Sequence, residues 1–167
     1  MMDANTFNAQ LWQDETSSTS SQVYALLDGA RDARLVQMVY GSGQDYACLY
    51  TGKLSLQLQA AAPYLVQLSP GSRFTRELFR HGWGRSWGVF AVAPPEVTLD
   101  TLRRHFRTLL RVRDELGRNL VFRFYDPRVL RIYLPTCTAA ETKTVYGPTT
   151  AFLVEDERAA GLTRYPR

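Results

Sequence analysis

The chain has 167 residues with 45% hydrophobic and 12% aromatic side chains, which suits one globular domain with its own core and excludes a mainly disordered chain. No stretch reaches the about 18 consecutive apolar residues of a membrane-spanning helix, and the first residues lack a leader-like segment, so we expect a cytoplasmic protein. The only cysteines, Cys48 and Cys137, follow no metal-ligand or redox spacing, which disfavours a disulfide framework or zinc cluster. The net charge of +4 conceals an uneven distribution of charged residues along the chain.

The first part of the chain alternates polar and apolar stretches. Residues 1–22 are polar and predict a loosely held arm. VYALLDG (23–29) predicts a strand that ends at a glycine, followed by a helix over 30–40 and a loop. YACLY (46–50) and PYLVQL (63–68) predict two further strands, and the proline suits the first position of the second.

The middle of the chain predicts two amphipathic helices around one strand. A basic helix is expected over 72–80, and HGWGRSWG (81–88) then breaks the pattern before the apolar strand VFAVA (89–93). The segment 98–116 carries leucine and phenylalanine at three- and four-residue spacing behind Thr98, a suitable N-cap. It therefore predicts a long helix with arginines on its other face.

The last part of the chain begins with LVFRFY (120–125), which predicts a strand. DPRVLRIYL (126–134) and TAAETKTVYG (138–147) predict two short helices, and TAFLVE (150–155) predicts the last strand. The tail, 156–167, is polar and is expected to fray.

Strands that alternate with amphipathic helices predict an α/β fold. We expect a single domain with a mostly parallel or mixed sheet of about five strands and helices on both faces. Its organisation would be a polar N-terminal arm at 1–22, one domain at 23–155 and a C-terminal tail at 156–167, without internal repeats.

Asp28 and Asp126 both stand where a strand should end and a helix begin. Asp126 precedes Pro127, and aspartate at the N-cap with proline at the first helical position is typical of a helix start. If the two strands were parallel and close, both carboxylates would meet at a sheet edge, so a small carboxylate-dependent hydrolase is one alternative. Capping already accounts for both residues, and no nucleophile or histidine completes a mechanism, so we assign no catalytic residue.

His81, His105 and the glycine-rich HGWGRSWG (81–88) show no ligand-binding pattern. Neither histidine belongs to a metal-binding or triad motif, and His105 is expected to lie solvated beside the arginine face. The G-x-G pair precedes a strand, whereas a dinucleotide loop follows one, so a turn that packs Trp83 and Trp87 on the core is favoured. We expect no metal and no cofactor.

Residues 73–131 contain thirteen arginines and six carboxylates, a net charge of +7. Five of the arginines follow one another in the long predicted helix: Arg103, Arg104, Arg107, Arg111 and Arg113. A nucleic-acid-binding domain is a second alternative, but base-stacking aromatic residues are missing there and nearby carboxylates offer local partners. A solvated or protein-docking face is favoured.

Several stretches occur together in a specific order and spacing. They are YALLDGAR (24–31), CLYTG (48–52), APYLVQL (62–68), SWGVF (86–90), LRRHFRTLLRV (102–112), VFRFYDPRVL (121–130) and YGP (146–148). In this combination the chain resembles, over about residues 22–155, the type VI secretion adaptor family, whose members are also called effector chaperones. The resemblance implies a non-enzymatic task without cofactor, metal or membrane: members bind a toxic effector in the bacterial cytoplasm and load it onto the VgrG spike protein.

The resemblance, together with the +7 charge of residues 73–131, suggests roles for individual residues. Two sets follow, one forming a structural signature and the other a partner-binding surface. The signature set is Asp28, Gly29, Phe124, Tyr125, Asp126, Pro127, Gly147 and Pro148. The partner-binding set is Arg103, Arg107, Arg111, Arg123, Arg128 and Arg131. The last three could pair internally with Asp28 and its neighbours or with carboxylates of a partner, and the sequence leaves both uses open.

Many relatives carry an additional C-terminal lobe, whereas this chain ends soon after FLVED. We therefore expect the cargo to be held through the signature domain alone or through a more limited surface. Which face meets the spike and which meets the effector stays open.

Overall fold

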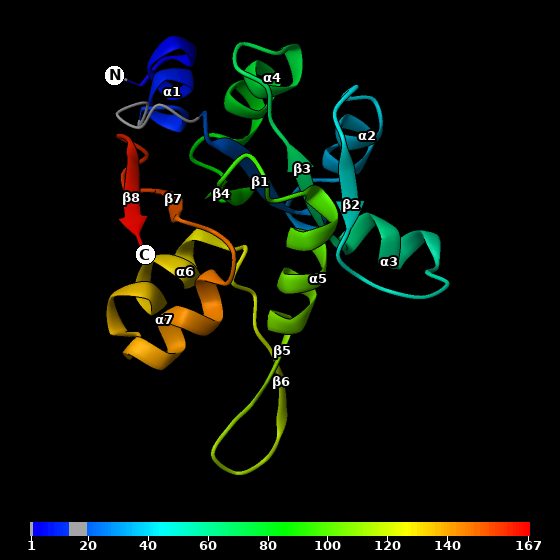
Figure 1. Cartoon of the computed structure of the whole chain (residues 1–167). Helices are drawn as coiled ribbons and strands as arrows, with labels where there is room; N and C mark the ends of the chain where they lie inside the picture. Colours follow the sequence, from blue (N-terminus) through cyan, green and yellow to red (C-terminus); the bar gives the residue numbers. More distant parts are fainter. Residues whose placement is uncertain (1, 14–19) are drawn as a thin grey trace.

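A six-stranded antiparallel sheet forms the centre of the computed structural model, which describes residues 2–13 and 20–167 (Figure 1). In spatial order the strands are β2 (Tyr46–Cys48), β3 (Pro63–Gln67), β1 (Gln22–Asp28), β4 (Gly88–Ala93), β7 (Ala151–Glu155) and β8 (Leu162–Pro166). All neighbouring strands pair antiparallel. The single α/β domain is confirmed, but the prediction of a mostly parallel or mixed sheet with about five strands is wrong.

The strand order separates the strands that point the same way. α2 (Leu35–Tyr40) connects β1 to β2, and α4 (Arg73–Gly82) connects β3 to β4; both pairs point the same way, but a strand of opposite direction lies between their members. α3 (Leu56–Ala61) lies in the connection between β2 and β3, which pair directly and antiparallel. Alternating strands and helices therefore do not by themselves produce a parallel sheet.

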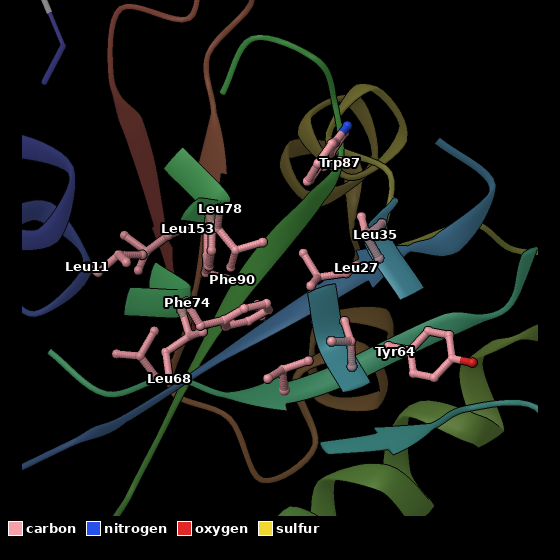
Figure 2. Packing of buried hydrophobic residues seen from close by; sticks show 14 of the residues in the cluster. Leu11, Leu27, Leu35, Tyr64, Leu68, Phe74, Leu78, Trp87, Phe90 and Leu153 are labelled. Atoms are coloured by element: carbon pink, nitrogen blue, oxygen red, sulfur yellow. The ribbon is translucent and has the colours of Figure 1, made fainter. Parts of the chain in front are cut away.

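Helices cover both faces of the sheet, as predicted. Along β1, Val23, Ala25 and Leu27 face one core and Tyr24 and Leu26 face the other, because successive strand residues point to opposite sides. The first core is completed by α2, α4 and α1 (Ala4–Leu11), and Figure 2 shows its side chains gathered over the sheet. The second core is completed by α5 (Leu99–Leu109), α6 (Pro127–Tyr133), the 3-10 turn at Leu134–Thr136 and α7 (Ala139–Tyr146).

The two segments predicted to be loose are docked on this domain. Phe7 of α1 is buried, and its ring lies 5.3 to 5.5 Å from the rings of Phe79, Trp83 and Phe90. β8 pairs with β7 along its whole length, and its Leu162 N–H donates to the side chain of Gln10 in α1. The predictions of a loosely held arm and a frayed tail are therefore wrong for 4–11 and 162–166; residues 14–19, which include most of the serine-threonine run, lie outside the described residues.

The long helix predicted over 98–116 ends at Leu109, and a hairpin follows it. Thr98 caps the helix as predicted, since its side chain accepts a hydrogen bond from the Thr101 N–H. β5 (Arg111–Arg113) and β6 (Asn119–Val121) then pair, and the turn between them is closed by Asp114 and by Gly117 at a φ of 75°. In Figure 1 this hairpin extends away from the central sheet. No helix in the described part of the chain is long and apolar enough to cross a membrane.

Candidate protein-docking surface

Asp28 and Asp126 are buried caps that are each paired with an arginine. The Asp28 carboxylate accepts a hydrogen bond from the Ala30 N–H at 3.1 Å and forms an ion pair with Arg123. Asp126 caps α6 and accepts from the guanidinium of Arg128 at 2.7 and 3.0 Å. The capping roles are confirmed, and both arginines find internal partners while the outer parts of their side chains face solvent.

The electrostatics of Asp126 do not suit acid catalysis. Burial alone would raise the pKa of this carboxyl, but the hydrogen bonds from Arg128 outweigh burial and hold the pKa below its ordinary value. Asp126 therefore stays ionised at neutral pH, which does not suit the proton-donor role in a paired-carboxylate hydrolase. Since Asp28 is likewise enclosed and bound to Arg123, this geometry lends the hydrolase alternative no support.

The signature glycines are places where the backbone is closely approached. A Cβ on Gly29 would lie 2.6 Å from the carbonyl oxygens of Ala60 and Ala62. Gly147 has a φ of 51°, and a Cβ there would lie 2.3 Å from the ring of His105. Both positions therefore require glycine for packing.

The prediction that His105 lies solvated beside the arginine face is wrong. Its Nε2 donates to the Val145 carbonyl at 2.9 Å, and burial lowers the pKa of the ring despite this hydrogen bond. The adjacent aromatic signature residues are also structural: Phe124 is buried and stacks on Phe106 at 5.5 Å, Tyr125 is buried beside it, and Pro127 occupies the start of α6. These residues join β6, α6 and α7 to the sheet.

The predicted arginine face of the long helix is divided in the structure. Arg103 and Arg104 both pair with Asp100 on the same helix. Arg107 turns inward and donates to the carbonyls of Leu49 at 3.1 Å and Cys48 at 3.0 Å, with a longer contact of 3.4 Å to Tyr50. The arginine face of the helix is therefore interrupted at Arg107.

The remaining arginines that were expected to bind a partner also differ in whether they make contacts within the domain. Arg131 donates through Nη1 to the Glu155 carbonyl at 2.9 Å, and its Nε lies 3.9 Å from a carboxylate oxygen of Glu157. Arg111 and Arg113 are exposed on β5. Of the six predicted partner-binding arginines, Arg111 is the one whose side chain makes no hydrogen bond or ion pair within the described part of the chain.

Glu155 explains the HGWGRSWG turn, and sequence reasoning missed it. Its buried carboxylate accepts hydrogen bonds from the N–H groups of Gly84 at 2.9 Å and Ser86 at 3.0 Å. Trp83 donates through its indole N–H to the Ala159 carbonyl, and Trp87 is buried as predicted. This segment is a turn held by β7.

A groove lies between the segment after β2 and the end of α5 with its hairpin. It has a volume of about 670 Å³, and we call it the docking groove. Its lining residues are Leu49, Tyr50, Thr51, Leu54, Leu58, Arg107, Leu110, Arg111 and Val121. No carboxylate is among them, so the groove combines apolar side chains with a positively charged side.

The walls of the docking groove carry exposed apolar side chains. Leu58 on α3 is 50% exposed and Val121 on β6 is 67% exposed. Sequence reasoning missed this site because α3 was not predicted. The available signal was Ser55, which caps α3, and the repeated leucines of KLSLQL (53–58).

A second groove of about 610 Å³ lies between α2 and α4. It is lined by Ala33, Arg34, Gln37, Met38, Gly41, Ser42, Arg73, Phe74, Glu77 and His81. Its charges are mixed, since Glu77 pairs with His81 at 3.0 Å and Arg34 with Asp32 at 2.8 Å. In the described part of the chain, no group of three or more histidine, cysteine or acidic residues could hold a metal ion.

Comparison with known families gives one match. Residues 23–144 match the model of a family described as a domain of unknown function, DUF4123, which covers well over half of the chain. Neither a curated protein nor a solved structure matches the chain. The matched region begins in β1, ends in α7, and contains the whole docking groove.

Proposed function

The chain belongs to the DUF4123 family, known as a domain of type VI secretion effector adaptors, and on this premise we propose that it binds one toxic effector and loads it onto a VgrG spike protein. The task would be non-enzymatic and would take place in the cytoplasm of a Gram-negative bacterium. The observation that carries the proposal is the family match over 23–144, the same region that holds the resemblance in sequence.

The surface of the domain supports a role in protein binding. Exposed apolar side chains on both walls of the docking groove are typical of protein-protein contacts, because soluble proteins seldom leave such side chains gathered without a use. The six arginines predicted to bind a partner remain a proposal as a set. Their surroundings favour Arg111, since Arg107 is engaged with backbone carbonyls.

The first experiment is co-purification of the tagged chain from its own bacterium under conditions where the secretion system is expressed. Mass spectrometry should identify a VgrG protein and a toxin together, and the tag alone should recover neither. Deletion of the adaptor gene should then abolish export of that toxin, while other substrates of the machine are still exported. Export of the toxin at the normal level from the deletion strain would refute the proposal.

A further inference from the structure

We propose that the docking groove binds a short amphipathic segment of a protein partner, which places apolar side chains between Leu58 and Val121 and a carboxylate against Arg111. This inference deepens the proposed function and rests on it in one respect: it takes the ligand of the adaptor to be a protein. It assigns the chemistry of the bound segment and the surface that binds it.

The apolar part of the proposal follows from the two facing walls. Leu54 and Leu58 form one wall, Leu110 and Val121 form the other, and Leu49 lies at the floor. Because Leu58 and Val121 each expose half or more of their surface, an apolar side chain inserted between them would remove both from water. A groove of about 670 Å³ accommodates a few side chains of a peptide.

The charge of the ligand follows from the two arginines in the groove. Arg107 is satisfied by the carbonyls of the floor, so it fixes the floor in place. Arg111, four residues further along the chain at the start of β5, offers an exposed guanidinium, and the lining contains no carboxylate to neutralise it. A planar guanidinium at the edge of an apolar groove suits bidentate binding of a carboxylate.

The hairpin exposes apolar side chains that a bound segment would cover. A two-stranded hairpin is at best marginally stable on its own in water. The β5–β6 hairpin exposes apolar side chains on opposite faces, with Val121 on the groove side and Val112 and Leu120 on the other. A segment lying in the groove would contact the hairpin along Arg111 and Val121 and so support it.

The test uses a photo-cross-linking amino acid introduced into the full-length chain, at Leu58 in one variant and at Val121 in another. The matched control position is Ile132 on α6, which is 69% exposed and lies outside the groove. Cross-linking is carried out in the producing bacterium, and the linked peptide is identified by mass spectrometry. We expect both groove positions to link to the same segment, containing apolar residues and at least one aspartate or glutamate, and Ile132 not to link to it.

Charge reversal then tests the contact with Arg111, with the cross-linked partner purified as the probe. Arg111→Glu should weaken binding by about tenfold or more, since it places like charges together, and a change of the partner's acidic residue to arginine should restore it. Arg73→Glu, in the groove between α2 and α4, is the matched control and should leave affinity unchanged. Equal weakening by both variants, a linked segment without acidic residues, or linkage at Ile132 alone would overturn the inference.

These outcomes separate the inference from the proposed function. A linked acidic segment from a protein unrelated to secretion would refute the adaptor role and leave the inference standing. A toxin or spike protein that co-purifies but links at neither Leu58 nor Val121 would refute the inference and leave the adaptor role standing.

Discussion

Arg107 and Arg111 lie four residues apart, yet the structure predicts that only Arg107 stabilises the fold. Arg107→Met keeps the aliphatic part of the side chain and removes the donors to the Leu49 and Cys48 carbonyls, at 3.1 and 3.0 Å. A hydrogen bond from a charged group contributes about 1.5–3 kcal/mol, and two of them on a half-buried side chain give a loss of about 2–3 kcal/mol. At about 2–4 °C per kcal/mol for a chain of this size, Tm should fall by about 4–12 °C.

Arg111→Met is the matched control, because the same substitution is made on an exposed side chain. Its effect on stability should stay within about 0.5 kcal/mol, and Tm within about 2 °C of the unchanged protein. Thermal unfolding followed by circular dichroism measures both variants. If Arg107→Met left Tm unchanged, or if the two variants fell equally, Arg107 would not hold the floor of the docking groove.

Three further predictions concern the fold. Gly147→Ala should lower the free energy of unfolding, measured with urea, by about 1–3 kcal/mol, because the added Cβ meets the His105 ring. This loss should exceed that of Gly117→Ala, where φ is also positive but no atom lies within 4 Å. Phe7→Ala should cost about 3–5 kcal/mol if α1 belongs to the core, whereas an undocked arm would give almost no change. Burial alone would raise the pKa of Asp126, but the hydrogen bonds from Arg128 hold this pKa below its ordinary value. The ionised carboxylate therefore stabilises the fold above about pH 4, and this contribution is lost as pH falls through the pKa of the folded state. Asp126→Asn should therefore lose less stability than the unchanged protein between pH 6 and pH 3, and equal losses would contradict this.

The buried strands could be predicted from the sequence because each is a nearly continuous apolar run. β1, β3, β4 and β7 all lie within a residue or two of their predicted positions. Their directions could not be predicted, since these depend on which strand lies between the two ends of each helical connection. α1 was missed for a similar reason: its two buried side chains, Phe7 and Leu11, become informative only once the core that receives them is known.

The end of α5 shows a second limit of periodicity. Helical spacing is kept by Leu102, Phe106 and Leu109, and Leu116 continues the apolar pattern. The periodicity therefore predicts a helix to residue 116, whereas the observed helix ends at Leu109. What ends it is the turn chemistry of Asp114 and Gly117, which closes a hairpin instead. The candidate site was missed as a consequence, because the hairpin supplies one of its walls.

Some residues of the docking groove lie in the stretches that resemble the adaptor family, and others lie between them. Its floor belongs to the stretches that resemble the adaptor family, with Leu49 and Tyr50 in CLYTG (48–52) and Arg107 in LRRHFRTLLRV (102–112). Leu54 and Leu58 on one wall lie between those stretches, whereas Arg111 and Val121 on the other wall lie within them. An adaptor that serves one effector must differ from other adaptors at the surface it uses while keeping the scaffold that folds it. Segment 53–61 meets that requirement, because it borders the groove without contributing the buried signature residues. Replacing the exposed side chains of this segment should therefore change the partner while leaving the fold intact.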